Sequence, residues 1–418
     1  MSAFPVSRGE LHVERVSLAT IAERFGTPCY VYSRAALEAN YDAFDAAFAG
    51  LPHLVCYAMK ANSNLAILNL LARRGAGFDI VSGGELERVI AAGGDPAKTV
   101  FSGVGKSALE MEAGLACGIR CFNVESAAEL EVLNAVAGRV GKRAPISIRV
   151  NPDVDPKTHP YIATGLKESK FGVAYNEAPA LYAHAAGLAH IDVQGLDCHI
   201  GSQITDAGPY LDALDRLLEL VEAIEARGIE IRHLDLGGGL GITYTDEKPP
   251  AAEALVRSLL ERIDARGHGH RKVMFEPGRS LVGNAGVLVS EVLYVKPGEQ
   301  KNFCIVDAAM NDLMRPAMYQ AYMAVEPCTR RNEAPLTWDV VGPICESGDW
   351  LARERELALR EGDRLAVLSA GAYGMSMASN YNTRPRAAEL MVDGARVHLI
   401  RQREEAQQLF TGERLITP

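Results

Sequence analysis

Short apolar runs alternate with longer amphipathic segments from about residue 51 to residue 279. Within 211–227, apolar residues from Leu214 to Ile224 recur every three or four positions, which places them on one face of a helix. The pattern predicts eight strands, at 53–59, 77–81, 98–102, 121–125, 145–151, 193–200, 231–236 and 272–276. Helices are predicted between them, for example at 65–74, 127–137, 211–227 and 252–265.

This alternation predicts an α/β fold with a parallel sheet. Eight strand–helix units in roughly 230 residues match the size of a (β/α)8 TIM barrel. An open doubly wound sheet is the alternative, but such sheets do not usually contain eight consecutive units. We therefore expect a barrel.

The pattern changes after residue 279. Strand-like runs at 286–295, 302–307, 337–341 and 364–368 follow one another, with no long helix until about 402–410. A further strand-like run, 29–32, precedes the barrel pattern. We expect three segments: an N-terminal segment (1–35) that joins a β-dominated domain, the barrel (36–280), and the C-terminal part of the β domain (281–418).

Composition narrows the class of protein. Of 418 residues, 48% are hydrophobic and 23% are charged, which is typical of a globular protein and excludes disordered and collagen-like chains. The 43 Lys and Arg against 53 Asp and Glu give a net charge of −10, which disfavours nucleic acid as a partner. The chain has no signal peptide pattern and no apolar run of membrane-spanning length, so we expect a cytoplasmic protein without a membrane partner. The eight cysteines include no Cys-x-x-Cys pair, and no metal site is expected.

Polar and glycine residues cluster where the predicted barrel strands end. In a (β/α)8 barrel these carboxyl ends form the active-site face. Each residue alone has an ordinary structural explanation: a solvated lysine, a packed histidine, a glycine turn. Their joint occurrence favours a site, composed of Lys60, Asp79, His199, Ser202, Gly237, Gly238, Gly239, Glu276, Gly278 and Arg279.

The chemistry of these residues suggests pyridoxal 5′-phosphate as the cofactor. Gly237, Gly238 and Gly239 follow the seventh strand, where barrels commonly bind phosphate through backbone N–H groups. Lys60 offers an amine for the aldehyde, and Glu276 offers a carboxylate that would raise the pKa of the ring nitrogen. The shape of His199 suits stacking on the ring.

Four motifs resemble the fold-type III pyridoxal-phosphate decarboxylases. They are Tyr-Ala-Met-Lys-Ala-Asn at 57–62, His-Ile-Gly-Ser-Gln at 199–203, Gly-Gly-Gly at 237–239 and Glu-Pro-Gly-Arg at 276–279. Two further stretches are similar to the diaminopimelate decarboxylases within that family: Gly-Pro-Ile-Cys-Glu-Ser-Gly-Asp at 342–349, and His159-x-x-Ile162-x-Thr164-Gly165 followed by Ser-Lys-Phe-Gly at 169–172. The resemblance extends from about residue 26 to residue 390.

The resemblance implies a role for each matching residue. Lys60 resembles the lysine that forms a Schiff base with the cofactor, with Asp79 near it, and His199 resembles the histidine that stacks on the ring. The predicted phosphate cradle contains Gly237, Gly238, Gly239, Gly278 and Arg279, assisted by Ser202. Glu276 matches the partner of the ring nitrogen, and Cys345 matches the catalytic proton donor. Substrate-binding positions are matched by Arg279, Arg315, Tyr319, Glu346 and Tyr373, and Tyr373 also touches the cofactor.

The family also implies a substrate and an assembly. The expected reaction converts meso-2,6-diaminopimelate to L-lysine and CO2, the last step of lysine biosynthesis. It takes place in a homodimer whose active sites lie at the interface, beside a mobile loop at 152–168. The alternatives are a decarboxylase of ornithine or arginine, a racemase, or a non-catalytic relative. Glu276 disfavours a racemase, because racemases usually place an arginine at the ring nitrogen. The presence of Lys60 and Cys345 disfavours a non-catalytic relative.

Overall fold

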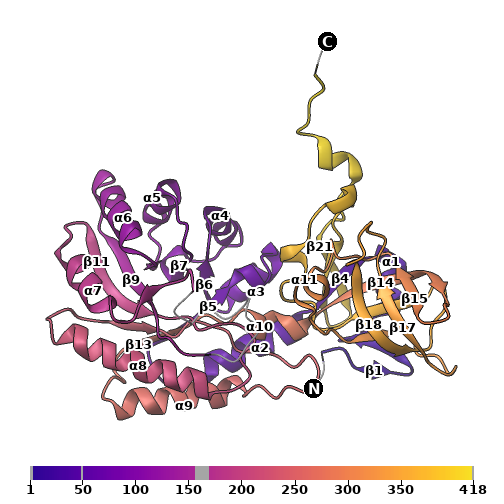
Figure 1. Ribbon diagram of the computed structural model, residues 1–418, viewed down its shortest axis with the longest axis horizontal. Helices are drawn as coiled ribbons and strands as arrows, with labels where there is room; N and C mark the ends of the chain where they lie inside the picture. The colour runs from indigo at the N-terminus through magenta and orange to yellow at the C-terminus, as the bar shows by residue number, and fades with distance from the viewer. Residues whose placement is uncertain (1–2, 49, 156–168, 417–418) are drawn as a thin grey trace. The chain divides into compact units, whose positions relative to one another are not determined.

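The computed structural model describes residues 3–48, 50–155 and 169–416. The chain divides into two compact units (Figure 1). The barrel unit contains Asn40–Thr243 and Glu247–Ser280, and the β unit contains Met1–Ala39, Tyr244–Asp246 and Leu281–Pro418.

Eight parallel strands close into a ring in the barrel unit, which confirms the predicted (β/α)8 barrel. Seven of the strand contacts follow chain order, and the pairing of β13 with β5 completes the closure. The strands are β5 (His53–Ala58), β6 (Gly77–Ile80), β7 (Thr99–Phe101), β8 (Cys121–Val124), β9 (Ala144–Asn151), β11 (Ile191–Asp197), β12 (His233–Asp235) and β13 (Lys272–Phe275). A short strand, β10 (Val173–Ala174), pairs with the end of β9.

Helices connect these strands and lie on the outside of the ring (Figure 1). Several begin at a Ser or Asn that caps the first turn, and Ser107 of α5 forms a full capping box with Glu110. The caps fix where each loop ends, so each strand end is held at a defined place. The helices are α2 (Arg34–Ala47), α3 (Leu65–Arg73), α4 (Gly83–Ala91), α5 (Ala108–Cys117), α6 (Ala127–Arg139), α7 (Ala178–Gly187), α8 (Gly208–Glu225), α9 (Ala252–Ala265) and α10 (Arg279–Val282).

Part of the barrel core is apolar and tightly packed. One buried cluster comes from β5, β7, β8 and β13 and consists of Leu54, Cys56, Val100, Cys121 and Met274. Leu54 and Met274 are direct partners in the ladder between β5 and β13. Burial of apolar side chains of this kind stabilises the barrel, and the polar side chains collect instead at the carboxyl ends of the strands.

The β unit is built around one sheet that combines an N-terminal strand with strands from the C-terminal part of the chain. Its strands run in the order β18-β17-β15-β14-β4-β20-β21, and β19 joins β14 to β16. The N-terminal strand β4 lies between β14, which it meets antiparallel, and β20, which it meets parallel. The predicted β domain with an N-terminal contribution is therefore confirmed. The bounds are β4 (Cys29–Ser33), β14 (Gly286–Lys296), β15 (Asn302–Val306), β16 (Val325–Pro327), β17 (Leu336–Val341), β18 (Trp350–Leu357), β19 (Arg364–Val367), β20 (Ala388–Asp393) and β21 (Arg396–Arg401).

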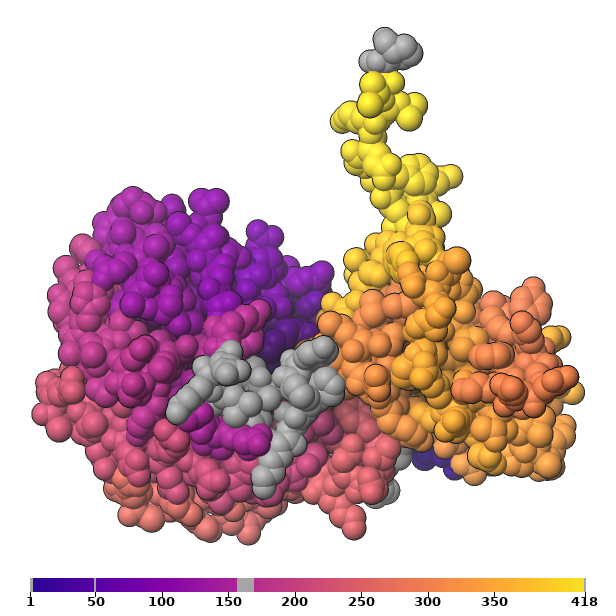
Figure 2. Space-filling model, in the orientation of Figure 1, coloured from indigo at the N-terminus to yellow at the C-terminus, as the bar shows by residue number. Residues whose placement is uncertain are grey.

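Smaller elements complete the β unit. A three-stranded sheet and helix α1 (Leu18–Phe25) precede β4, and helix α11 (Arg315–Tyr319) follows β15. The three strands are β1 (Val6–Ser7), β2 (Glu10–Val13) and β3 (Val16–Ser17). The helix expected near 402–410 is only a five-residue 3-10 helix, η7 (Ala406–Phe410), and residues 411–416 project beyond it as part of an arm (Figure 2). No helix among the described residues is both long enough and apolar enough to cross a bilayer.

Candidate active site

Lys60 and Asp79 form an ion pair at the mouth of the barrel. Lys60 lies in the one-turn helix η1 (Met59–Ala61) directly after β5, and Asp79 lies on the neighbouring strand β6, opposite Ala58 in the ladder. The Nζ atom of Lys60 is 2.9 Å from Oδ2 of Asp79. Asp79 is fully buried, whereas the side chain of Lys60 is 36% exposed. The amine of Lys60 is therefore held in place by the buried carboxylate of Asp79 and can be reached from solvent.

The three consecutive glycines are required by the packing of neighbouring strand ends. A Cβ atom on Gly238 would lie 1.9 Å from the backbone oxygen of Glu276, and one on Gly239 would lie 2.1 Å from that of Gly201. Gly237 and Gly239 also have positive φ angles, of 64° and 100°. The sequence pattern predicts that these glycines allow a phosphate to approach, and the structure adds this second reason for them.

Two of the three glycine amides already have partners within the chain. Gly237 donates its N–H to Oδ1 of Asp235 at 3.0 Å, and Gly238 donates to Nδ1 of His199 at 3.1 Å. Within the part of the chain that the structure describes, the N–H of Gly239 makes no hydrogen bond. This amide can bind an anion without breaking an existing contact.

His199 is neutral in this setting. Burial, together with the positive charges of Arg149 and Lys60, holds the pKa of its imidazole well below the ordinary value. Because Nδ1 accepts the hydrogen bond from Gly238, Nε2 bears the single proton of the neutral ring. An uncharged imidazole is suited to lie against an aromatic ring.

Two residues that we did not predict hold the glycine loop in place. The side-chain amide of Gln203 donates to the backbone oxygen of Ile242 at 2.6 Å and accepts from its N–H at 3.2 Å. The hydroxyl of Tyr210, on α8, donates to the backbone oxygen of Gly238 at 3.0 Å. Gln203 belongs to the motif at 199–203, but its contacts could not be read from the sequence.

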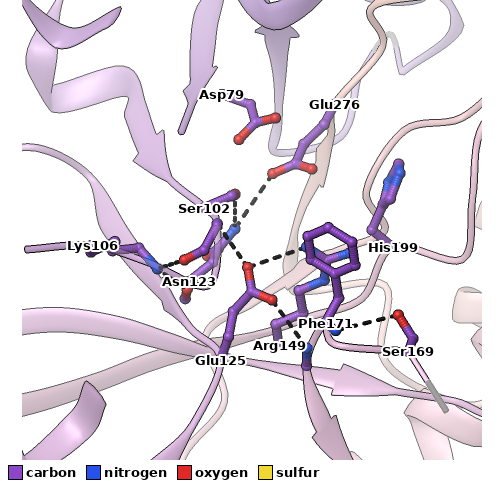
Figure 3. A network of polar contacts seen from close by, with 12 residues as sticks. Asp79, Ser102, Lys106, Asn123, Glu125, Arg149, Ser169, Phe171, His199 and Glu276 are labelled. Atoms are coloured by element: carbon purple, nitrogen blue, oxygen red, sulfur yellow. Dashed lines mark hydrogen bonds and ion pairs between the residues drawn. The ribbon is translucent and has the colours of Figure 1, made fainter. Parts of the chain in front are cut away.

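Glu276 follows β13 and is almost fully buried. Its N–H donates to the backbone oxygen of Gly237 at 2.6 Å, and its Oε1 accepts from Nδ2 of Asn123 at 3.4 Å (Figure 3). Burial raises the pKa of this carboxyl well above the ordinary value, and the nearby Asp235, Asp79 and Asp197 add to the increase. The ammonium of Lys60 acts in the opposite direction.

The other predicted cradle residues lie beside this group. Arg279, at the start of α10, donates from Nη2 to Oγ of Ser202 at 3.0 Å, and this contact brings together the ends of the sixth and eighth strands. A Cβ atom on Gly278 would come within 3.1 Å of Ala58, so this glycine lets the two loops approach. The barrel residues predicted from the sequence therefore lie at neighbouring strand ends.

A buried network of charged groups lies below these residues and was missed by the sequence analysis (Figure 3). Glu125 accepts hydrogen bonds from the N–H groups of Gly103 and Gly172, at 2.7 and 3.0 Å, and pairs with Arg149 at 3.3 Å. The guanidinium of Arg149 lies 4.8 Å from the ring centroid of Phe171. These contacts connect the ends of β7, β8 and β9. They could not be predicted from the sequence, because they depend on how the strands pair in the barrel.

Lys106 extends the network behind Glu125. Its ammonium donates to Glu129 at 2.8 Å and to the backbone oxygens of Gly103 and Asn123 at 2.8 and 2.7 Å. The side chain is only 1% exposed. Glu129 in turn accepts the N–H of Glu125 at 3.0 Å. A fully buried ammonium with three acceptors is a structural support for the site.

The remaining predicted residues belong to the β unit. Cys345 and Glu346 are exposed on the turn between β17 and β18, where the N–H of Cys345 donates to Asn382 at 3.0 Å and Glu346 accepts from Tyr381 at 2.5 Å. The buried Asp349 anchors this turn by accepting two backbone N–H groups, those of Met310 and Ile344, both at 2.7 Å.

The arginine and the two tyrosines of the β unit occupy other segments. Arg315 begins α11, hydrogen-bonds the hydroxyl of Tyr244 and lies 4.8 Å from its ring centroid. Tyr319 ends the same helix, and Tyr373 follows β19 with a φ of 55°. The predicted loop at 152–168, with the motif from His159 to Gly165, lies outside the described residues from position 156 onward.

The relatives of this chain are decarboxylases. Residues 34–283 match the family model for the pyridoxal binding domain of pyridoxal-dependent decarboxylases. A diaminopimelate decarboxylase of Pseudomonas aeruginosa is 61% identical over 416 residues, which covers 100% of both chains. This chain belongs to the diaminopimelate decarboxylase family.

Further members of the diaminopimelate decarboxylase family agree in length and fold. The Vibrio cholerae protein of that name is 56% identical over 98% of this chain and 97% of its own length. The crystal structure of diaminopimelate decarboxylase from Helicobacter pylori, complexed with L-lysine, has a TM-score of 0.90 at 41% identity, covering 94% of this chain and 98% of that one. The enzyme class and the cofactor predicted from the sequence are confirmed by this membership.

The barrel residues of this family member fit pyridoxal 5′-phosphate. The site offers an accessible amine on Lys60, an amide on Gly239 and a guanidinium on Arg279 for an anion, and a buried acid on Glu276. Oδ1 of Asp79 is buried and has no hydrogen-bond partner among the described residues. The buried acids therefore favour a ligand that brings positive charge.

Proposed function

We propose that the chain removes CO2 from meso-2,6-diaminopimelate and releases L-lysine. The observation that supports this most directly is the placement of Lys60, Asp79 and Glu276 at the ends of β5, β6 and β13, which are adjacent in the barrel. An amine and an acid on neighbouring strands can contact one cofactor at two points. The family relationship supplies the substrate class.

Each part of the cofactor has residues that would hold it. Lys60 would bind it through its amine, Glu276 would partner its ring nitrogen, and His199 would lie against its ring. The phosphate contacts are assigned to Gly237, Gly238, Gly239, Gly278, Arg279 and Ser202. When bound, pyridoxal 5′-phosphate supplies an aldehyde that takes up an amine and a ring that accepts the electron pair left by a departing carboxyl group.

Other side chains handle protons and the substrate. We assign the proton that replaces CO2 at the substrate carbon to the thiol of Cys345, because a thiol is mostly protonated at neutral pH. The guanidinium groups of Arg279 and Arg315 bind the distal carboxylate, and Glu346 binds the distal ammonium, with Tyr319 and Tyr373 beside them. Lys60 would supply the amine that allows the product to leave.

Selectivity then depends on the distal end of the substrate. Every α-amino acid presents the same reacting groups, so the distal carboxylate and ammonium must distinguish diaminopimelate from ornithine or arginine. A site built around charged partners rejects molecules that lack those charges by roughly 10⁴-fold. The measurement is CO2 release from meso-diaminopimelate, ornithine, arginine and lysine with the purified holoenzyme. Comparable turnover of ornithine would overturn the assignment.

The assembly we propose is a homodimer with active sites at the interface. Cys345 and Glu346 are exposed on a turn whose base is anchored by Asp349, as expected for a segment that reaches into a partner subunit. The family resemblance supplies the expectation that this segment meets the partner's barrel mouth.

A further inference from the structure

Three acidic side chains meet at the carboxyl ends of the adjacent strands β11, β12 and β13. Asp197 on β11 and Asp235 on β12 are direct partners in the strand ladder, and Glu276 follows β13 beside them. One carboxyl oxygen from each lies within 4.8 Å of the other two. All three residues are buried, with Glu276 the most exposed at 5%.

Few hydrogen-bond donors compensate this concentration of negative charge. Asp235 accepts the N–H of Gly237, and Glu276 accepts the weak hydrogen bond from Asn123. Oδ1 of Asp197 is buried and has no partner within the described residues. Buried polar atoms without a partner are rare and usually mark a functional constraint.

The charges that face the cluster from other strands do not balance it. Arg149, the ladder partner of Asp197 on β9, contributes one positive charge, but it also pairs with Glu125. Lys60 contributes a second positive charge and is paired with Asp79. Five acids therefore face two cations here: Asp79, Glu125, Asp197, Asp235 and Glu276 against Lys60 and Arg149.

Such a group of acids cannot be fully ionised. Burial first, and then the mutual repulsion of the carboxylates, raises the pKa of Asp197 and of Glu276 well above the ordinary range, and burial raises that of Asp235 to about 7. The raised pKa values favour a proton retained among the three carboxyls in the chain without cofactor, and acids this close together titrate in a coupled way.

We propose that Asp197 and Asp235 are positioning residues that act through Glu276: the three carboxyls share a proton and pass it to the ring nitrogen of the cofactor. One O–H bond breaks and one N–H bond forms, so the ring gains one positive charge and the cluster one negative charge. The negative charge left on the cluster then keeps the ring protonated. The proposal rests on the assignment of Glu276 to the ring nitrogen.

Asp197→Asn tests this directly, because the amide retains the shape of the side chain and removes its charge. The readout is the ring-nitrogen titration of the holoenzyme, followed by the ¹⁵N shift of labelled pyridoxal 5′-phosphate, together with the dissociation constant of the cofactor. We expect the ring to lose its proton about one pH unit lower and the cofactor to bind about tenfold more weakly, since one pKa unit is a tenfold effect. Asp235→Asn is expected to act in the same direction.

Asp192→Asn is the matched control, because Asp192 lies on the same strand outside the cluster and contacts Gln194 and Arg232. Its ring titration is expected to equal that of the unmodified protein. If Asp197→Asn and Asp235→Asn both behave like this control, the proposal is wrong. Glu276→Gln separates the two hypotheses: a ring that stays protonated in that variant overturns the role of Glu276 itself.

The full chain without cofactor gives a second readout. Acids whose pKa is raised by folding favour the folded state at low pH, and this contribution is lost as the pH rises from about 4 toward 7 and beyond. The free energy of unfolding of the unmodified chain is expected to fall over pH 5–8 more steeply than that of Asp197→Asn. Equal slopes would mean that Asp197 holds no share of a proton and would refute the proposal.

Discussion

Burial and neighbouring charges determine the charge states of individual side chains at the barrel mouth. Asp79 is fully buried against the ammonium of Lys60, and Glu276 is buried among other acids. Burial, together with the positive charges of Arg149 and Lys60, lowers the pKa of His199. The chemistry proposed for each side chain therefore depends on its neighbours as much as on its identity.

Residue types at strand ends could be read from the sequence, whereas the partners of these residues could not. Lys60, His199 and Glu276 follow predicted strands, and their residue types and positions alone suggest a cofactor. The acids on β11 and β12 looked like ordinary strand residues, since a strand pattern does not say which residue of a neighbouring strand lies opposite. Only the ladder between β11 and β12 places Asp197 beside Asp235.

The buried His233 allows a test of how burial changes the pKa of a histidine and the stability of the fold. Burial, with the positive charges of Arg120 and Lys272, lowers the pKa of its imidazole to about 3, and its Nε2 contacts Oγ of Ser147 at 2.8 Å. A base with a lowered pKa stabilises the fold above the unfolded value, and this stability is lost as the pH falls below about 6.5.

His233→Gln is expected to remove that loss. In urea unfolding between pH 6.5 and 5, the difference in unfolding free energy between the unmodified protein and the variant should shrink by about 1 kcal/mol per pH unit. A difference that is independent of pH would show that His233 titrates normally.

Lys106 provides a second test, because it is the buried cation of the charged network. Lys106→Met leaves Glu129 buried without its partner and is expected to lower the unfolding free energy by about 3–5 kcal/mol. Arg257→Met, which removes an exposed ion pair with Glu253, should change it by less than about 0.5 kcal/mol. Similar losses in the two variants would contradict a structural role for the buried pair.

The loops that follow the barrel strands contain the positions that are least tolerant of a larger side chain. The glycine loop after β12 touches the end of β11 through Gly239 and the end of β13 through Gly238. The predicted barrel strands and helices lie within a few residues of the observed ones, because apolar runs and helical spacing are local signals. The packing of one strand end against another is not local.

Gly238→Ala tests this packing. The new Cβ atom would lie 1.9 Å from the backbone oxygen of Glu276, so the loop must shift, and we expect a loss of at least about 3 kcal/mol in unfolding free energy together with weaker cofactor binding. Gly105→Ala is the control, because nothing lies within 4 Å of the position that its Cβ would take, and it should change stability by less than about 0.5 kcal/mol. Normal stability of Gly238→Ala would show that the loop has room.

The charged edge strand β18 was not predicted from the sequence. Arg353 to Glu356 form a run of four charged residues whose side chains are mostly exposed, and they lie in β18. This strand is at the edge of its sheet, where charged residues are common because they prevent pairing with other molecules. A charged edge strand has no apolar alternation, so the strand pattern could not reveal it.

At the scale of the whole molecule, the proposed active site draws on two chains of a dimer. If each active site combines Lys60 of one subunit with Cys345 of the other, a substitution at either residue inactivates a dimer in which both chains carry it. A Lys60→Ala chain and a Cys345→Ala chain would then be inactive separately, and a heterodimer would contain one intact site.

Mixing the two variants under conditions of subunit exchange tests this arrangement. Half of the dimers become mixed and each has one intact site of two, so about a quarter of the unmodified activity should return. The control mixes Lys60→Ala with a Lys60→Ala, Cys345→Ala double variant, which should stay inactive. No recovery despite proven exchange would place both residues in one chain.

The strand β4 has a consequence for how the protein is made. It lies between β14 and β20, so its neighbour at Ala388–Asp393 leaves the ribosome long after Cys29–Ser33 has been synthesised. The barrel, whose last strand ends at Phe275, can assemble during translation, whereas β4 must wait for β14 and then for β20 before both of its edges are paired. Premature termination before residue 388 should therefore leave one edge of β4 without its partner strand. Such an edge can pair with other chains, so we expect these truncated chains to bind chaperones.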